Sequence, residues 1–290
     1  MEFKPSELIL NEDGSIFHLK LKPGEVADDI LLVGDPGRVD LISGFFESIE
    51  VNKQNREFKT VTGTYKGKRI SVISSGIGTD NIDIVVNELD AITNIDTEQR
   101  KVKKQHTPLN FIRVGTSGAI QENIPVGSFV MSEKSIGFDN LLHFYSIDTG
   151  NEDMTKALKK HLHWNEELPF PYIVDAEKNL YESFHKTSKY ISGVNISSPG
   201  FYGPQGRKLR IPHSDNALNN KIESFQYNKM KITNYEMESS AIYSLSKSLG
   251  HNALTVCAII ANRITKDFAG DYKHIIKNLV KEVLEITVNK

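Results

Sequence analysis

The sequence predicts an α/β protein with helices on both faces of a central sheet. Short apolar runs typical of buried strands alternate along the chain with segments of helical spacing. Three of the apolar runs lead into glycine-containing turns. No repeat, low-complexity tract or linker divides the sequence, so residues 1–290 are predicted to form a single domain.

The elements follow from hydrophobic periodicity, with period 2 or continuous runs for strands and i, i+4, i+7 spacing for helices. Apolar runs predict strands at 30–34, 69–78, 110–120, 127–134, 190–198 and 253–262, of which 69–78 and 110–120 run into glycine loops. Helical spacing predicts helices at 38–46, 81–92, about 234–249, and 272–288. The last helix is expected to bury one stripe, formed by Ile275, Leu279, Val283 and Ile286.

The composition excludes several classes of protein. The net charge is −2, and the basic run Arg100–His106 contains no interleaved aromatic residue, so no nucleic-acid partner is expected. No stretch approaches 18 uncharged apolar residues, and the N-terminus lacks a signal-peptide pattern. The lone Cys257 lies in an apolar run, which excludes an internal disulfide and fits a reducing compartment. A cytoplasmic globular protein without membrane attachment is expected.

The glycine turns indicate an anion site. The turns span Val33–Arg38, Ser74–Asn81 and Val114–Ala119, and Arg38 and Arg113 lie in or beside two of them. Ligands of open α/β sheets collect at the carboxyl ends of strands, where glycine turns expose N–H groups and arginine offers a charged fork. Each turn alone is equally consistent with an ordinary structural connection. None has a dinucleotide or P-loop pattern, which counts against those two classes.

The stretch "NYEMES" raises a separate question about two acids. If the helix begins there, Glu238 shares one face with Ile242, Leu245 and Leu249, whereas Glu236 points the other way. A carboxylate that faces a core needs a partner, because burying an unpaired charge is costly. The helix alone leaves two interpretations of Glu238: an acid that favours the positive end of its helix, or a ligand-binding group.

These motifs together resemble the uridine phosphorylase branch of the nucleoside phosphorylase family. The resemblance runs from about residue 16 to 265, and it rests on motifs that occur in the family's order. It implies a three-layer α/β/α sandwich with a central mixed sheet. The motifs are "IFHL" (16–19), "GDPGRV" (34–39), "NREF" (55–58), "RVGTSGA" (113–119), "FYGPQGR" (201–207) and "YEMES" (235–239).

The resemblance implies a role for each matching residue. Those on phosphate are Gly34, Arg38, Arg113, Thr116 and, from a neighbouring subunit, Arg56. Those on ribose are Glu236, Met237, Glu238 and a neighbour's His18. Those on the base are Phe201, Gln205, Arg207 and Arg263, with Arg207 and Gln205 also stabilising the leaving group.

The implied activity is that of a transferase, a pentosyltransferase that converts uridine and phosphate to uracil and ribose 1-phosphate in pyrimidine salvage. Phosphate is the nucleophile and co-substrate, so neither a cofactor nor a metal is expected in catalysis. Uracil's O2, N3–H and O4 call for an amide that donates and accepts, together with a cationic donor. Purine-acting relatives carry an acid where this chain has Arg263, and this difference favours a pyrimidine. A homodimer is the implied minimal unit, and bacterial relatives assemble three such dimers into a hexamer.

Several features depart from the family pattern. Extra residues occur at about 96–108 and 208–220, and the second insertion directly follows Arg207, where it is expected to reshape the base pocket. Some relatives hold a monovalent cation between subunits near positions matching Glu57, Ile77 and Asn81, but Asn81 replaces the expected serine, so this site stays open. The alternatives are a purine phosphorylase or nucleosidase on the same fold, or a non-catalytic nucleoside-binding protein.

Overall fold

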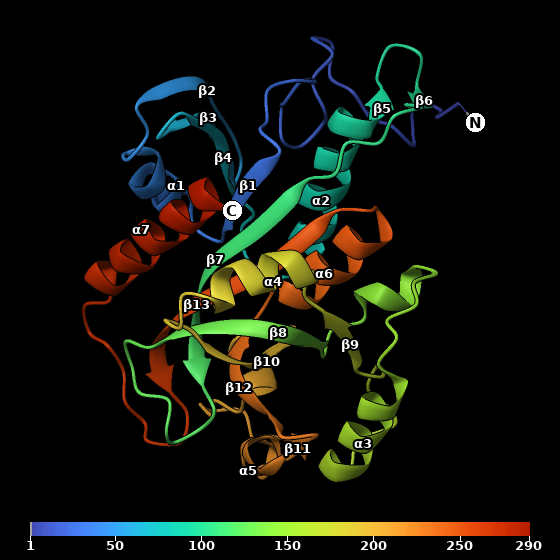
Figure 1. Cartoon of the computed structure of the whole chain (residues 1–290). Helices are drawn as coiled ribbons and strands as arrows, with labels where there is room; N and C mark the ends of the chain where they lie inside the picture. Colours follow the sequence, from blue (N-terminus) through green and yellow to red (C-terminus); the bar gives the residue numbers. More distant parts are fainter. Residues whose placement is uncertain (1) are drawn as a thin grey trace.

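The computed structural model describes residues 2–290 and is built around one large β-sheet (Figure 1). The strands are β1 (Asp29–Val33), β2 (Ser48–Asn55), β3 (Phe58–Tyr65), β4 (Lys68–Ser74), β7 (Asn110–Ala119), β8 (Phe129–Gly137), β9 (Tyr172–Asp175), β10 (Ile191–Ser197), β11 (Gln226–Tyr227), β12 (Met230–Glu236) and β13 (Asn252–Asn262). Their order is β11-β12-β10-β8-β13-β7-β1-β4-β3-β2, with β9 beside β8. Parallel pairs such as β1–β4 are combined with antiparallel pairs such as β3–β4, which confirms the predicted mixed sheet.

The sheet also closes on itself at the far end of β7. Asn234 and Tyr235 of β12 pair antiparallel with Ala119 and Gly118 of β7. Because β7 pairs along its other edge with β13, the strands β7, β13, β8, β10 and β12 form a closed ring. This closure brings the end of β12 against the carboxyl end of β7.

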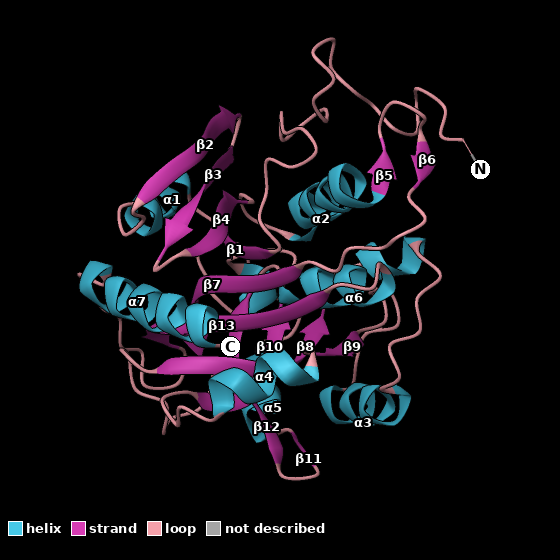
Figure 2. Cartoon of the chain, turned by 45° about the horizontal axis from the view of Figure 1, so that its top comes forward, coloured by secondary structure: helices cyan, strands magenta, loops and turns pink. Residues whose placement is uncertain are grey.

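Helices cover both faces of the sheet, as predicted (Figure 2). The N-terminal segment packs with α2 and α6 over one face, and α1, α4 and α7 cover the other. A third core joins α3 and α5 to the closed ring. The bounds are α1 (Pro36–Ser43), α2 (Thr79–Asn94), α3 (Glu152–Leu162), α4 (Lys178–His185), α5 (Leu218–Ser224), α6 (Ser239–Ser248) and α7 (Lys273–Asn289), with 3-10 turns η1 (Leu141–Phe144) and η2 (Gly203–Gln205).

Two local predictions are wrong. The glycines of Val114–Ala119 do not form a turn, because β7 stays paired with β13 through to Ala119. Gly115 is instead required by a close approach, since a Cβ there would overlap the Arg113 guanidinium and Cys257. The helix expected from "NYEMES" begins only at Ser239, and the residues up to Glu236 belong to β12.

The two insertions lie at opposite ends of the molecule (Figure 1). The first contains the hairpin of β5 (Ile95–Asp96) and β6 (Lys101–Val102), and Arg100 there donates to the carbonyls of Phe3 and Lys4 at 2.8 and 3.2 Å. It therefore anchors the N-terminal segment. The second insertion runs into the start of α5.

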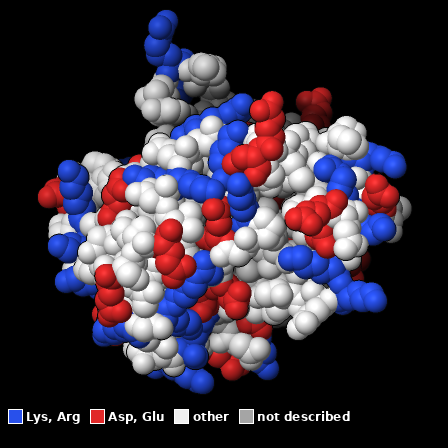
Figure 3. Space-filling view, turned by 90° about the horizontal axis from the view of Figure 1, so that it is seen from above, with Lys and Arg blue, Asp and Glu red and all other residues white. Residues whose placement is uncertain are grey.

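The surface charges are mixed. On the face seen in Figure 3, basic and acidic side chains are interspersed, in keeping with the net charge of −2. The basic run Arg100–His106 is largely exposed. Across the part of the chain that the structure describes, no helix is long and apolar enough to cross a membrane.

Candidate active site

Two glycine turns meet at the carboxyl ends of neighbouring strands. Gly34 follows β1, and Gly76 and Gly78 follow β4, which is paired in parallel with β1. A Cβ at Gly34 would lie 3.3 Å from the carbonyl oxygen of Gly76, so the two turns are in close contact. Gly76 and Gly78 have φ values of 73° and 100°, a region that favours glycine. The expected anion-binding edge is therefore formed by two turns that pack on each other.

Arg113 and Glu238 form a buried ion pair beside these turns. Arg113 of β7 keeps 7% of its surface exposed and Glu238 keeps 3%. The other Glu238 oxygen accepts the backbone N–H of Gly78 at 2.8 Å. Arg113 also lies 3.4 Å from the carboxylate of Glu236 and donates to Cys257 Sγ at 3.3 Å. Glu238 thus has protein partners of its own, and a sugar hydroxyl is not needed to explain its burial.

This cluster contains two acids, Glu236 and Glu238, that contact one cation, Arg113. Burial raises the pKa of Glu238, and the nearby Glu236 raises it further, although Arg113 opposes both effects. Burial also disfavours the Arg113 cation, but Glu238 and Glu236 outweigh this and raise its pKa above the usual value. Arg113 is therefore a permanent cation held between two acids. With five N–H donors it has more than these partners use.

Glu236 is buried as well, which corrects the prediction that it points away from Glu238. Its carboxylate accepts the backbone N–H groups of Glu238 and Ser239, at 2.9 and 3.0 Å, and the hydroxyl of Ser197. The helical count fails because Glu236 ends a strand, so its side chain faces the first N–H groups of α6 rather than a helix flank. Met237, between the two acids, is half-buried.

Arg38 places a second guanidinium at the same edge. It lies on α1, and its Nη1 donates to the carbonyl of Val114 in β7 at 3.1 Å. Burial lowers the pKa of Arg38, and the positive charge of Arg113 lowers it further. The two arginines are therefore close enough to repel each other, an arrangement that an anion between them would relieve. Thr116 follows on β7 and is half-buried.

Arg56 and His18 face outward. Arg56 is exposed, with a φ of 54°, at the turn between β2 and β3, and its side chain makes no hydrogen bond or ion pair within residues 2–290. His18 lies on the N-terminal segment, where Nδ1 is 2.6 Å from Glu88 of α2. The Nδ2 group of Asn55, next to Arg56, donates to the His18 carbonyl at 2.8 Å. These two predicted site residues therefore belong to one surface unit.

The predicted base residues are brought together at the other end of β7. Gln205, 2% exposed, accepts through Oε1 from Arg207 at 2.8 Å and from Arg263 at 3.0 Å. The Arg207 guanidinium lies 3.5 Å above the centre of the Phe201 ring and donates to the Phe201 carbonyl. Phe201 remains 49% exposed, so its other side can still receive a planar base. Because both arginines donate to the amide oxygen, the amide of Gln205 is left as a donor.

Both of these arginines have a lowered pKa. Burial and the charge of Arg263 lower the pKa of Arg207 to about 10, and burial lowers the pKa of Arg263. A Cβ at Gly118 would lie 2.7 Å from the Arg263 guanidinium, which therefore rests directly on the backbone of β7. This end of the site is a cluster of N–H donors suited to developing negative charge.

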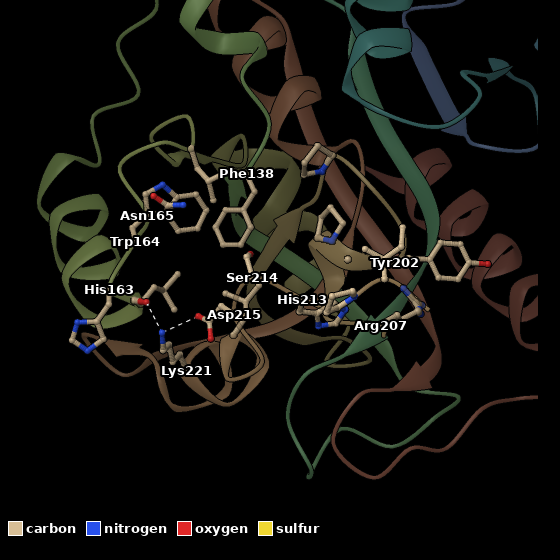
Figure 4. A pocket seen from close by; sticks show the side chains of 18 of the residues that line it. Phe138, His163, Trp164, Asn165, Tyr202, Arg207, His213, Ser214, Asp215 and Lys221 are labelled. Atoms are coloured by element: carbon tan, nitrogen blue, oxygen red, sulfur yellow. Dashed lines mark hydrogen bonds and ion pairs between the residues drawn. The ribbon is translucent and has the colours of Figure 1, made fainter. Parts of the chain in front are cut away.

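A cavity of about 1360 Å³ adjoins the base residues. Tyr202 and Arg207 lie on one side of it, and Phe138 and Trp164 on the other (Figure 4). Residues 209–215 of the second insertion form much of its wall, so this insertion does shape the surroundings of the predicted base pocket. The ion pair of Lys221 with Asp215, at 2.8 Å, ties the insertion to α5.

Other contributors to the site make contacts that the local sequence does not report. The N–H of Gly78 and the hydroxyl of Ser197 bind the two carboxylates, and Gly118 makes room for Arg263. Each partner is at least 39 residues away in the sequence from the group that it contacts. Local periodicity cannot report such pairs, although the glycines themselves lie in the motifs described above.

Asp90, His106 and His251 form a separate group with potential metal ligands. The N–H of Leu109 donates to His251 Nδ1 at 3.1 Å, so the ring's proton lies on Nε2, which faces Asp90 at 3.1 Å. His106 Nε2 lies 2.9 Å from the carbonyl of Leu249 and donates to it. Nitrogens that carry protons do not ligate a metal. These two Nε2 atoms are therefore occupied as hydrogen-bond donors, and the group braces the first insertion against the start of β13.

The fold and the site define a class of α/β proteins that gather arginines and buried carboxylates at one edge of a mixed sheet. Residues 28–289 match the model of the Phosphorylase superfamily, and this chain belongs to that family. The chain is similar to the uridine phosphorylase of Thermococcus kodakarensis, with 32% identity over 270 residues, 92% of this chain and 84% of the relative. It is also similar to the DeoD-type purine nucleoside phosphorylase of Brevibacillus brevis, with 32% identity over 251 residues, 86% and 87% of the two chains.

Solved structures of phosphorylases are similar to this chain as well. A Trypanosoma brucei nucleoside phosphorylase that shows uridine phosphorylase activity superposes with a TM-score of 0.88 and 31% identity, covering 98% of this chain and 100% of that one. A uridine phosphorylase structure from Phytophthora capsici is a second match, with a TM-score of 0.76 and 20% identity. The match covers 100% of this chain and 99% of that one. At that identity the second match supports the fold alone.

Proposed function

We propose that this chain catalyses the phosphorolysis of uridine, giving uracil and ribose 1-phosphate. The observation that carries the proposal is a pair of donor clusters beside β7. Arg38 and Arg113 meet near the middle of β7, at Val114, and Arg207 and Arg263 converge on Gln205 beside Gly118, near its carboxyl end. An anion and a planar base with carbonyl groups are the ligands that such clusters bind. The whole chain acts as a single domain, in keeping with the continuity of its sheet.

At the anion end, the arginines hold phosphate below C1′ of the sugar. A positioned phosphate turns a bimolecular attack into an effectively unimolecular one. Gly34 leaves room for the anion, and Thr116 adds a hydroxyl. Because Glu236 and Glu238 already balance the charges of Arg38 and Arg113, a phosphate with two charges requires further cations, and Arg56 of a second copy supplies one of them.

At the sugar, Glu238 accepts from ribose hydroxyls with the lone pairs that Arg113 and Gly78 leave free. Glu236 fixes the backbone of Glu238, and Met237 lies against the ring. His18 of a second copy contacts the 5′-hydroxyl. As the glycosidic bond lengthens, the sugar gains positive charge, which the attacking phosphate stabilises.

At the base, Phe201 packs on the uracil ring, and Gln205 and Arg207 donate to its oxygens. Negative charge grows on these oxygens chiefly in the transition state, so donors that are already in place lower the barrier. Arg263 holds Gln205 from the opposite side. The complete transfer moves the ribosyl group from the uracil nitrogen to a phosphate oxygen, in the manner of a pentosyltransferase of pyrimidine salvage.

The proposed minimal unit is a homodimer. Arg56 and His18 lie on one outward-facing unit, and exposed apolar residues occur near α2, among them Phe17 (38%), Ile77 (67%) and Tyr145 (39%). Tyr145 Oη bonds Asp83 of α2, and Phe17 packs edge-on against the His18 ring. Apolar patches rimmed by polar residues mark association surfaces. A second copy of the chain is the occupant that would complete both sites at once.

Purine phosphorolysis is the second candidate, because purine nucleoside phosphorylases are also among the relatives. A purine leaving group is helped by protonation, for which the family pattern uses an acid. Here the corresponding residue is Arg263, a cation bound to Gln205, and it has no carboxyl proton to give. The geometry therefore favours uracil over hypoxanthine.

The proposal also covers the co-substrate, the location and the question of a cation. Inorganic phosphate is the co-substrate, and the cytoplasm is the proposed location. A monovalent cation could sit near Glu57 and Asn81, which both lie close to Gly76. The Asn81 amide, however, donates to the carbonyl of Ile77 at 3.4 Å, which takes up one of the oxygens that a cation would use. We therefore place no requirement for a cation on the reaction.

The test is uracil release from uridine by the purified protein, with and without phosphate, and with inosine run in parallel. Uracil formed only with phosphate, and faster than hypoxanthine from inosine, is the expected result. Uracil formed without phosphate would indicate a nucleosidase, and preferred cleavage of inosine would indicate a purine phosphorylase. Uridine binding without product would indicate a non-catalytic nucleoside-binding protein.

A further inference from the structure

Glu88, in the middle of α2, makes an unusual set of contacts with the N-terminal segment. Its Oε1 and Oε2 accept the backbone N–H of His18 at 2.9 and 3.0 Å, and Oε2 accepts that of Leu19 at 2.8 Å. Its Oε1 also lies 2.6 Å from His18 Nδ1. One side chain on a helix thus binds both the backbone and the ring of a residue 70 positions away.

These contacts decide which nitrogen of the ring carries the proton. Both oxygens of Glu88 accept backbone N–H groups, so Glu88 acts as a hydrogen-bond acceptor here. The His18 Nδ1 must therefore be the donor in the short contact with Glu88. In the neutral ring, Nε2 is then left with a lone pair as a hydrogen-bond acceptor.

The rest of the surroundings hold the ring in place and leave Nε2 free. Phe17 and Phe58 meet the ring edge-on, at centroid distances of 4.8 and 6.3 Å. Asn55 holds the His18 carbonyl, which ties this segment to the hairpin that carries Arg56. The His18 side chain keeps 26% of its surface exposed, and within residues 2–290 Nε2 has no hydrogen-bond partner.

We infer that Glu88 is a positioning residue for the reaction: it fixes the tautomer and orientation of His18, so that Nε2 accepts a hydrogen bond from the 5′-hydroxyl of the nucleoside in a second copy's site. This inference rests on the proposed function for the identity of the hydroxyl. The fixed tautomer itself does not depend on the substrate. Glu88 reaches the substrate only through His18 and takes no part in the chemical step.

The tautomer is tested first, by nitrogen-15 NMR of the histidine rings, with the His18→Ala spectrum identifying the His18 signals. We expect a protonated Nδ1 and an unprotonated Nε2 in the wild-type protein. In Glu88→Gln the new amide can donate to Nδ1, so the proton should move to Nε2. A wild-type ring protonated on Nε2 alone would overturn the inference whether or not the protein acts on uridine.

The second test compares kcat/KM for uridine with that for 5′-deoxyuridine, which lacks the hydroxyl. Glu88→Gln should lower the ratio of the two values by roughly 3- to 10-fold, the worth of one hydrogen bond, while 5′-deoxyuridine itself is little affected. The double variant Glu88→Gln/His18→Ala should lose no more than His18→Ala, because the two residues act as one unit. Glu12→Gln, an exposed acid of the same segment, should leave the ratio unchanged.

The outcomes separate the two proposals. Equal losses on both substrates in Glu88→Gln would mean that Glu88 merely stabilises the segment, and the inference would fail while the proposed function stands. Absence of uracil formation by the wild-type protein would refute the proposed function, and the NMR result would then decide whether Glu88 controls the His18 ring.

Discussion

Glu236 accepts the backbone N–H of Glu238 at 2.9 Å, so one buried acid fixes the backbone of the other. Both carboxylates also face the Arg113 guanidinium. The two acids therefore have different contacts: Glu236 ends β12 and supplies acceptors for the start of α6, whereas Glu238 contacts the glycine turn after β4 through Gly78. A substitution of Glu236 should therefore act first on the stability of the fold.

Glu236→Gln should destabilise the fold. The carboxylate accepts two N–H groups at the start of α6, and an amide replaces one of its oxygens with a donor that these groups repel. We expect a loss of about 1–2 kcal/mol in the free energy of unfolding, as for a lost helix cap. Urea unfolding followed by circular dichroism measures it. An unchanged midpoint would show that this contact does not support α6.

Arg207→Ala should lower kcat/KM for uridine by about 10²–10³, the usual effect of removing a donor aimed at transition-state charge. Arg207 is the donor shared by Gln205 and the Phe201 carbonyl, so its loss also loosens the base pocket. Lys208→Ala is the matched control, since Lys208 is an exposed basic residue of the adjacent insertion that does not line the cavity. Full activity in Arg207→Ala would show that the leaving group is stabilised elsewhere.

Arg56→Ala and Arg38→Ala should each be nearly inactive with normal stability, yet active when mixed after reversible subunit exchange. If Arg56 acts in a neighbour's site, a mixed dimer contains one site with both arginines. Random exchange would then restore about a quarter of the wild-type activity, since half of the dimers are mixed and each has one of its two sites intact. No recovery on mixing would place Arg56 in its own chain's site, or outside any site.

Asp29→Asn should lower stability in a pH-dependent way. Asp29 is 6% exposed and pairs with Lys68, at 2.8 Å, and with Lys290. Burial opposes its ionisation, but the two lysines outweigh burial and hold its pKa below the usual 3.8. A lowered pKa means that the stabilisation is complete above pH 3.8 and is lost as the pH falls through the folded-state value.

The free-energy difference between wild type and Asp29→Asn should therefore be about 2 kcal/mol near neutral pH and should shrink below pH 3.8. Urea unfolding at a series of pH values measures it. Glu122→Gln, at an exposed position, should give a small difference at every pH. A difference that grows in acid would contradict the assigned sign.

The elements with clear local periodicity were predictable, whereas β2, β3, β9, β12, α3, α4 and α5 were not predicted. The buried run of β1 and the buried positions Leu279, Val283 and Ile286 of α7 follow directly from the sequence. The extended backbone of β7 at Gly115 and Gly118 was not predictable. Its glycines are the usual signal of a turn, but pairing with β13 and the space needed by Arg113 keep this segment extended.

The sequence by itself determined the α/β class and identified the arginines, acids and glycines of the two clusters. Only the tertiary structure decided how they meet. Closure of the sheet through β12 and β7 places Glu236 and Glu238 on Arg113, and Glu88 reaches His18 across 70 residues. The physical reason is that periodicity reports which face of an element is buried, whereas the partner of a buried charge is set by strand order and register, which local sequence does not encode.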